Sequence, residues 1–289
     1  MPQQKTLSKP VRLGGVGLHT GAEVRLELVP ADPDTGVVFV RTDLAGCPRV
    51  EARISNLGFR PRRTALVKGS AEVHTTEHLL AALCASGVQN VEVRLDAPEL
   101  PGLDGSALPF YGAIQEGGIV PQGVPARQID VVAPVHAEER GAWIAAFPSD
   151  NGSFTICYTL DYSALAQSTG ASPAMQALAT QYLEVTVTEE VFAREIAPAR
   201  TFVFEEEVHQ LRAEGLGRGA TPQNTVVLGR DGILENRLRF RDELVRHKVL
   251  DLIGDLYLLG SAPRGRFVAA KSGHALNVRI AKMLEPSEL

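Results

Sequence analysis

The chain has 289 residues, of which 44% are hydrophobic and 22% are charged. These proportions are those of a folded globular protein, and the length suggests two domains that each bury a core. A formal net charge of −5 argues against the broad basic surface with which proteins neutralise nucleic-acid phosphates, so no nucleic-acid partner is expected. Three widely spaced cysteines indicate neither a disulfide framework nor a thiolate zinc site.

The first residues lack the apolar core of a secretory signal, and no apolar run in the sequence is long enough to span a membrane. We therefore expect a cytoplasmic protein without a transmembrane segment. No coiled-coil pattern or sustained apolar stripe marks an interface, which leaves the oligomeric state open and favours a monomer.

The first half begins with a glycine-rich segment, residues 13–21, which predicts a flexible or tightly turned loop around His19. Taken alone, His19 is also typical of a surface turn. Residues 23–29 and 36–41 have the pattern of strands. Residues 73–87 predict a helix with Thr75 as its N-cap and Gly87 as its C-terminal stop, and with Glu77 and His78 in its first turn.

A strand over residues 88–95, a turn-rich loop and a helix over residues 108–116 complete this half. The segment 120–126 is rich in proline and glycine and is predicted to be a linker. It divides the chain into an N-terminal domain, residues 1–121, and a C-terminal domain, residues 126–289.

The second half repeats this order, with strand patterns at residues 129–135, 142–147 and 153–160. Residues 164–181 read as a loop or an added helical excursion. A helix over 205–214, a strand over 224–228, a long helix over 243–260, a strand over 267–271 and a helix over 275–284 follow. The order of these elements predicts an α+β fold of two similar layers, although the amino-acid sequence itself shows no repeat.

The helix over residues 243–260 carries an ionisable stripe on an otherwise apolar surface. Glu243, His247, Asp251 and Asp255 lie four residues apart and therefore share one face. Buried ionisable groups must be paired, hydrogen-bonded or bound to a metal, so this face needs partners from elsewhere in the chain. Glu243 has no evident partner and is interpreted as a helix N-terminal charge that faces solvent.

His247 and Asp251 lie one helical turn apart, so both side chains can reach one metal ion. A catalytic zinc site takes a third protein ligand and benefits from a neighbouring base, and His78 beside Glu77 provides both. An alternative interpretation needs no metal. Glu77 would then favour a helix N-terminus, His78 would pack, and His247 and Asp251 would form an ordinary pair on a helix.

Six segments, in this order, resemble the UDP-3-O-acyl-N-acetylglucosamine deacetylase family, the zinc amidases of lipid A synthesis. The resemblance extends from about residue 5 to residue 281. The segments are Gly-Val-Gly-Leu-His19-Thr-Gly, His-Thr-Thr-Glu77-His78-Leu-Leu, Leu-Asp104-Gly-Ser, Ala-Arg200-Thr201-Phe, Val-Arg-His247-Lys248-Val-Leu-Asp251 and Lys271-Ser-Gly-His274-Ala-Leu-Asn.

The resemblance implies a zinc ion held by His78, His247 and Asp251. It implies hydrolysis of the acetamide of UDP-3-O-(3-hydroxyacyl)-N-acetylglucosamine with release of acetate. The active site would lie between two domains whose helices pack together between their sheets. Glu77 would be the general base, and Thr201 would donate a hydrogen bond to the tetrahedral oxyanion.

Further roles follow from the same resemblance. His274, oriented by Asp255, would protonate the leaving nitrogen or stabilise charge as an imidazolium. Lys248 would face the anionic or sugar portion of the substrate, and His19 would line the substrate end of the site. Phe202 would pack on the nucleotide or sugar, and Gly217 lies in an insertion, about residues 203–232, that would form the acyl-chain passage.

One segment departs from the family pattern. After residues 158–162 the family usually continues with a His-Pro stretch, which this chain lacks, so sugar contacts near residues 163–181 are not implied. Two other functions remain open on the sequence. The chain could be a non-enzymatic acyl-sugar or nucleotide-binding protein, or a zinc deacetylase for a related amide. The sequence does not specify a preference for acyl-chain length.

Overall fold

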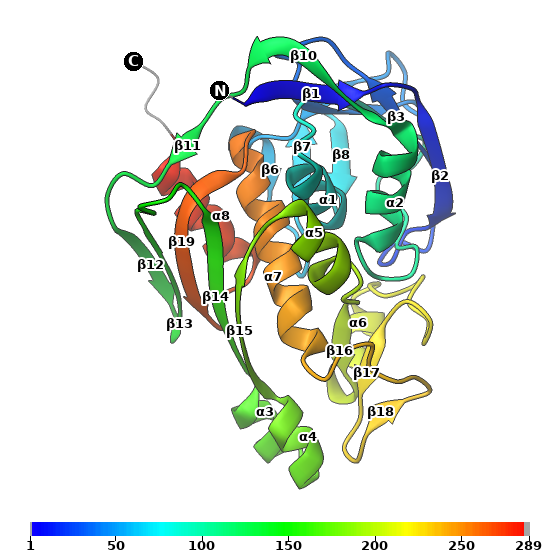
Figure 1. Cartoon of the computed structure of the whole chain (residues 1–289). Coiled ribbons are helices and arrows are strands. Elements are labelled where there is room, and N and C mark those ends of the chain that lie inside the picture. Colours follow the sequence, from blue (N-terminus) through cyan, green and yellow to red (C-terminus); the bar gives the residue numbers. More distant parts are fainter. Residues whose placement is uncertain (1, 286–289) are drawn as a thin grey trace.

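A mixed five-stranded sheet organises the first half of the computed structural model, which describes residues 2–285 (Figure 1). The strand order is β2-β3-β9-β4-β5. Strand β9 is antiparallel to β3 and parallel to β4, and the two outer pairs are antiparallel. The strands are β2 (Val11–Val16), β3 (Glu23–Pro30), β4 (Val37–Arg41), β5 (Arg49–Glu51) and β9 (Val91–Leu95).

The second half is built on a sheet with the same pairing scheme, in the order β12-β13-β19-β14-β15. Strand β19 is antiparallel to β13 and parallel to β14, as β9 is to β3 and β4. Its strands are β12 (Val135–Glu139), β13 (Ala142–Phe147), β14 (Phe154–Asp161), β15 (Thr180–Thr186) and β19 (Pro263–Ala270), with β11 (Ile129–Asp130) added beside β19. The α+β fold class expected from the order of elements is confirmed.

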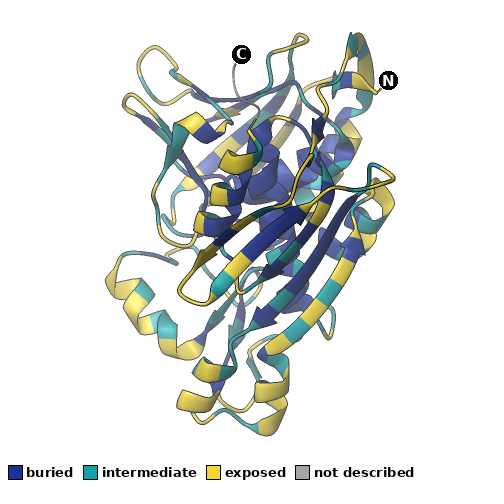
Figure 2. Ribbon diagram, turned by 90° about the vertical axis from the view of Figure 1, so that its left-hand side faces the viewer, coloured by how far each residue is buried: buried dark blue, intermediate teal, exposed yellow. Residues whose placement is uncertain are grey.

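Each half places one helix before its last sheet strand and another after it. Helix α1 (Glu77–Ser86) precedes β9 as α7 (Glu243–Leu256) precedes β19, and α2 (Leu108–Gly117) and α8 (His274–Leu284) follow those strands. Helix α1 packs on α7 and α2, and α7 packs on α8 and β14. The helices thus lie between the two sheets, where Figure 2 shows the buried residues concentrated.

Amphipathic strands produce this layered arrangement. In β3 the side chains of Val24, Leu26 and Leu28 are buried, whereas Glu23 and Arg25 on the other face are exposed. This period of two is the signature of a strand with one face on the core. Helix α7 instead is buried on nearly all sides, including the face that carries ionisable residues.

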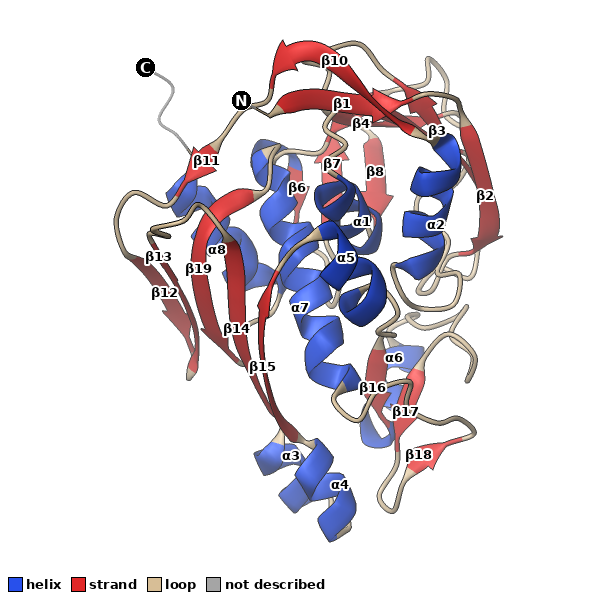
Figure 3. Ribbon diagram, viewed as in Figure 1, coloured by secondary structure: helices blue, strands red, loops and turns tan. Residues whose placement is uncertain are grey.

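Two small three-stranded sheets interrupt the repeated order at equivalent places, the first between β5 and α1 and the second between β15 and α7 (Figure 3). The first contains β6 (Leu57–Gly58), β7 (Ala65–Lys68) and β8 (Ala71–His74). The second contains β16 (Phe202–Phe204), β17 (Val226–Leu228) and β18 (Ile233–Leu234), with α6 (Glu205–Ala213). The remaining elements are α3 (Ser163–Ser168), α4 (Pro173–Leu178), α5 (Glu189–Val191), a π-helical turn (Phe192–Ile196) and two 3-10 turns (Ile54–Asn56 and Tyr257–Leu259).

Three local expectations were wrong. The segment interpreted as a linker forms β10 (Ile119–Pro125), which pairs with β1 (Gln3–Leu7). The glycine-rich segment is not wholly a loop, because Gly14 and Gly15 lie in β2 opposite Arg25 and Val24. Thr75 is not the N-cap of α1. It has a left-handed backbone, and its hydroxyl donates to the buried Glu99, so Thr76 takes the cap position.

Helices α1 and α7 cross at very short range because a glycine lies at the contact. A Cβ atom at Gly254 would lie 2.1 Å from the carbonyl oxygen of Glu77, closer than any real contact. The first turn of α1 therefore rests directly on the backbone of α7. This contact places Glu77 and His78 against the helical face that carries His247 and Asp251.

The crossing predicts a specific cost for Gly254→Ala. The methyl group forces α1 away from α7, and such overpacking lowers the free energy of unfolding by about 1–3 kcal/mol. Urea denaturation would measure the loss. Gly112→Ala is the matched control, because Gly112 lies in α2 with open space around its Cβ position. That variant should be neutral or gain up to about 1 kcal/mol. Equal stability of the two variants would contradict a tight crossing at Gly254.

Candidate metal centre and active-site pocket

Three buried side chains from two helices converge between the halves of the molecule. His78 lies on α1, and His247 and Asp251 lie one turn apart on α7. One donor atom of each lies within 4.8 Å of the others. The Nε2 atoms of His78 and His247 are 3.8 Å and 3.4 Å from Oδ1 of Asp251. A tetrahedral zinc ion with bonds of about 2.0–2.1 Å separates its donors by about 3.3 Å, so the spacing fits such an ion.

The protonation states of this group also suit a metal. Burial lowers the pKa of His78 to about 3 and lowers that of His247 as well, so both imidazoles are neutral. Burial would raise the pKa of Asp251, but the positive charges of Lys248 and His274 outweigh it and hold that pKa below its usual range. Nδ1 of His247 lies 3.1 Å from the carbonyl oxygen of Ala199. When Nδ1 donates this bond, Nε2 is left free as a ligand.

Glu77 lies beside this group at the start of α1. Burial raises the pKa of Glu77 to about 7. Its Oε2 atom accepts a hydrogen bond from the backbone N–H of Thr64 at 3.1 Å, and its Oε1 atom lies 3.9 Å from Nε2 of His274. A carboxyl group with a pKa near 7 can take up and release a proton near neutral pH.

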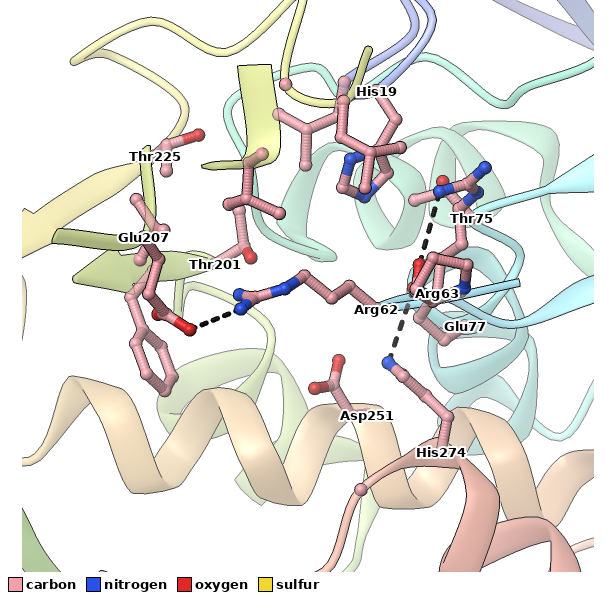
Figure 4. A pocket seen from close by; sticks show the side chains of 18 of the residues that line it. His19, Arg62, Arg63, Thr75, Glu77, Thr201, Glu207, Thr225, Asp251 and His274 are labelled. Carbon is pink, nitrogen blue, oxygen red and sulfur yellow. Dashed lines mark hydrogen bonds and ion pairs between the residues drawn. The ribbon is translucent and has the colours of Figure 1, made fainter. Parts of the chain in front are cut away.

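His274 begins α8 and faces Glu77 across the pocket (Figure 4). Its Nδ1 atom is 2.8 Å from Oδ2 of Asp255, which is fully buried one turn after Asp251. Burial lowers the pKa of His274, but the negative charges of Asp255 and Glu77 outweigh it and raise the pKa to about 9. The imidazole is therefore protonated at neutral pH, with Nε2 directed at the pocket.

The structure adds two residues to this pair that the sequence did not suggest. Thr64 donates its hydroxyl to Oδ1 of Asp255, and Asn277 donates to Oδ2 at 2.8 Å. Each oxygen of the fully buried Asp255 thus has a hydrogen-bond donor, as the burial of a polar group requires. Asn277 could have been found, since it follows His274 by three residues on the same helix. No periodic signal marks Thr64, which comes from the other half of the chain.

A large cavity surrounds these groups. Its volume is about 1230 Å³, and both halves and both inserted sheets contribute to its wall. All but one of the expected site residues line it, and the exception, Asp255, lies behind His274. The expected residues on the wall are His19, Glu77, His78, Thr201, Phe202, Gly217, His247, Lys248, Asp251 and His274.

The backbone of Thr201 connects the two halves at this wall. Its N–H donates to the carbonyl oxygen of Gly105 at 2.9 Å, and its carbonyl oxygen accepts from the N–H of Val226. Gly105 has a positive φ, and a Cβ atom there would lie 1.7 Å from the carbonyl oxygen of Asn224. The loop that contains Gly105 therefore tolerates only glycine where it meets the second half.

Lys248 and Phe202 lie close to the metal group. The Lys248 ammonium donates to Oδ2 of Asp251 at 2.7 Å. Burial lowers the pKa of Lys248, but Asp251 outweighs it and the pKa is raised. The ring of Phe202 is 6.2 Å from that of His247 and 5.9 Å from that of Tyr162. Lys248 is thus charged and tied to Asp251 while it lines the cavity.

The two inserted sheets also meet across the cavity. Arg62, in the loop between β6 and β7, reaches over it and pairs with Glu207 of α6 (Figure 4). Arg62 has a positive φ, and both side chains are partly exposed. This ion pair is therefore a contact between the halves at the edge of the cavity.

The interpretation of Glu243 was wrong. Its side chain is fully buried, not solvent-facing. Its Oε1 atom accepts from Nε of Arg200 at 2.8 Å, and Oε2 accepts from the backbone N–H of Arg239 at 2.6 Å. Glu243 therefore anchors the segment that leads to Thr201 to the start of α7.

Comparison with known proteins places this arrangement in a family. Residues 4–285 match the family model described as UDP-3-O-acyl N-acetylglycosamine deacetylase. The chain belongs to this family. It is 41% identical to the UDP-3-O-acyl-N-acetylglucosamine deacetylase of Thermosynechococcus vestitus over 97% of this chain and 93% of that protein. It is 39% identical to the proteins of the same name from Pseudomonas entomophila and Cellvibrio japonicus, over 98% of this chain and 90% of each.

Membership in this deacetylase family confirms the resemblance found in the sequence. The three-residue group of His78, His247 and Asp251 is the arrangement that a family of metalloenzymes leads one to expect. Within residues 2–285, no helix is both long and apolar enough to cross a lipid bilayer.

The metal group predicts that metal content depends on residues from both halves. The purified protein should carry about one zinc ion per chain, and His78→Ala, His247→Ala or Asp251→Ala should each lose most of it. Elemental analysis by inductively coupled plasma mass spectrometry would measure this. His136→Ala, on the exposed surface of β12, is the control and should keep its metal. Full metal content in His78→Ala and Asp251→Ala would disprove the assignment.

The pair of His274 and Asp255 predicts a change in pH dependence. On the expectation that His274 acts as an imidazolium, activity should fall as the pH rises through its pKa of about 9. Asp255→Asn removes the main charge that raises this pKa, so the alkaline limb of the kcat/KM profile should move to lower pH by about one unit or more. Asp130→Asn, which breaks a surface pair with Arg264, is the control. An alkaline limb unmoved by Asp255→Asn would show that His274 does not set it.

Proposed function

We propose that the chain is a zinc-dependent deacetylase that hydrolyses the acetamide of UDP-3-O-(3-hydroxyacyl)-N-acetylglucosamine and releases acetate in lipid A synthesis. The observation that carries this proposal is the position of Glu77. It lies beside the metal group and within 3.9 Å of a protonated imidazole, so a proton acceptor and a proton donor face one site. A structural metal site needs neither.

The donor set of two imidazoles and one carboxylate leaves room for water at a four-coordinate ion. A zinc ion held by His78, His247 and Asp251 would supply Lewis-acid activation of water and of the amide carbonyl. Glu77 accepts the proton of the attacking water, for which a pKa near 7 is well matched. The Thr64 N–H fixes the other oxygen of this carboxylate.

His274 completes the reaction on the other side of the scissile bond. Its imidazolium, held by Asp255, donates a proton to the leaving glucosamine nitrogen or stabilises the negative charge that develops before that transfer. The hydroxyl of Thr201 donates to the tetrahedral oxyanion. The backbone of Thr201 is fixed at Gly105 and Val226, so the hydroxyl is positioned before the reaction begins.

Polar residues of the cavity wall contact one part of the substrate, and apolar residues contact another. Lys248 faces the anionic or sugar portion, His19 lines the substrate end of the site and Phe202 packs on the nucleotide or sugar. Gly217, with its positive φ, turns the chain along the wall of the second inserted sheet. The acyl chain lies against that insertion, where the apolar wall residues are Phe204, Val208, Leu211, Leu216, Val227 and Leu234.

An acetate-release assay on the UDP-linked acylated substrate tests this function. The purified protein should release acetate, a chelator should abolish the release, and added zinc should restore it. Acetate can be quantified by a coupled enzymatic assay or by proton NMR. Tight binding of the substrate without acetate release would instead indicate an acyl-sugar-binding protein. Release that a chelator leaves unchanged would contradict the metal-dependent route.

Glu77→Gln separates the base from the metal in the same assay. The variant should keep its zinc and lose about 10²–10⁴ in kcat, the contribution typical of general acid–base catalysis. Glu116→Gln, an exposed position on α2, is the matched control and should keep full activity. A rate near that of the unsubstituted protein in Glu77→Gln would place the base elsewhere.

A further inference from the structure

Glu99 is a fully buried carboxylate without a cationic partner. Its relative exposure is 0%, and among residues 2–285 it forms no ion pair with a lysine, arginine or histidine. A charge in such a place is costly unless hydrogen bonds replace its hydration. Burial alone would raise the pKa of Glu99, but hydrogen bonds from Thr20 and His19 outweigh it and lower the pKa. The side chain is therefore ionised and acts only as a hydrogen-bond acceptor.

Its donors come from one loop and one neighbouring threonine. Oε2 accepts from the N–H and the hydroxyl of Thr20, both at 2.7 Å, and the N–H of His19 lies 3.0 Å and 3.1 Å from the two oxygens. Oε1 also accepts from the hydroxyl of Thr75 at 2.8 Å. Three of the four donors thus belong to the loop of residues 17–20.

The backbone around Glu99 is fixed as well. It forms a parallel bridge with His74, the last residue of β8, through a bond from His74 N–H to Pro98 at 2.8 Å and one from Leu100 N–H to His74 at 3.2 Å. The carboxylate is therefore a rigid anchor, and residues 17–20 are the part whose conformation depends on it.

The loop of residues 17–20 is closely packed around the Glu99 carboxylate. A Cβ atom at Gly17 would lie 2.6 Å from Oε2 of Glu99 and 2.6 Å from Oγ1 of Thr20. On its other side the loop binds the turn that follows α6. The carbonyl oxygens of Leu18 and His19 accept from the N–H groups of Gly219 and Arg218 at 3.1 Å and 3.3 Å. Residues 17–20 thus join the first half to the wall of the second insertion.

The side chain that this loop presents to the cavity has an unused polar atom. Nδ1 of His19 is buried and has no hydrogen-bond partner, although His19 lines the cavity. Burial lowers the pKa of His19 to about 4, so the ring is neutral. Buried polar atoms are normally paired, so a cavity-lining ring with an unpaired nitrogen has hydrogen-bonding capacity that the rest of the described chain does not use. Figure 4 shows His19 among the side chains around the cavity.

We propose that Glu99 is a positioning residue for substrate binding. It holds the backbone of residues 17–20 so that the imidazole of His19 is fixed on the cavity wall and bonds to a polar group of the substrate. This inference rests on the proposed deacetylase function. Glu99 does not contact the substrate itself and affects substrate binding only by positioning His19.

Glu99→Gln tests this role with the zinc-loaded enzyme in the acetate-release assay. The amide keeps the shape but replaces one acceptor oxygen with a donor that faces the loop N–H groups. A lost hydrogen bond to a charged group corresponds to a KM increase of about tenfold, with kcat within about twofold of the original. In a His19→Ala background the same substitution should change KM by less than about twofold, because coupled residues are not additive.

The matched control is Asn90→Ala. Asn90 is also buried in the first half and bridges Gln4, Gly36 and Gln122, but it does not line the cavity. It should lose stability and keep its KM. Where Glu99→Gln gives no folded protein, Thr20→Val removes one donor to Glu99 and should raise KM by a smaller factor, again only when His19 is present.

Two results would overturn the inference. One is that Glu99→Gln has the same KM as the control Asn90→Ala. Where Glu99→Gln does not fold, the same result for Thr20→Val would count equally. The other is a change in KM on Glu99→Gln that is as large in the His19→Ala background as in the original protein, or a change in kcat in place of KM. Either result would mean that Glu99 acts through Thr75 and α1 and not through His19. Absence of acetate release by the unsubstituted protein would instead reject the proposed function, so the two failures are distinguishable.

Discussion

The close crossing of α1 and α7 is the contact on which the rest of the site depends. Gly254 lets the backbone of Glu77 rest on α7, so the first turn of one helix meets the polar face of the other. The two helices hold equivalent places in halves with the same sheet topology. The proposed site at this contact therefore takes one candidate ligand and the proposed base from the first half and two candidate ligands from the second, and neither half contains it alone.

Burial of charge at this contact is balanced by partners from distant parts of the chain. Asp251 is paired with Lys248 and lies near the imidazoles of His78 and His247, and Asp255 is bonded to His274, Thr64 and Asn277. The same environment separates the pKa values of two facing groups. The pKa of Glu77 is raised to about 7, and that of His274 to about 9. A proton acceptor and a proton donor can therefore coexist at neutral pH, as hydrolysis of an amide requires.

The sequence predicted the site best where function follows local spacing. His247, Asp251 and Asp255 could be assigned to one face because four residues make only slightly more than one helical turn. Glu99 and Thr64 could not, since their roles arise from contacts between segments far apart in the chain. Glu243 was misinterpreted because a helix N-terminus is usually solvated, whereas here it is covered by Arg200. The duplicated topology was anticipated from the order of elements, while the strand at residues 119–125 was hidden by its two prolines and its glycine.

Anomalous diffraction at the zinc absorption edge is the most direct test for a single metal ion between α1 and α7. Crystals of the zinc-loaded protein should show one strong anomalous peak at about 2.0–2.2 Å from donor atoms of His78, His247 and Asp251. Glu77 should lie beside that peak without being a ligand. A peak bound by residues of one half only, or located outside the cavity, would contradict the account.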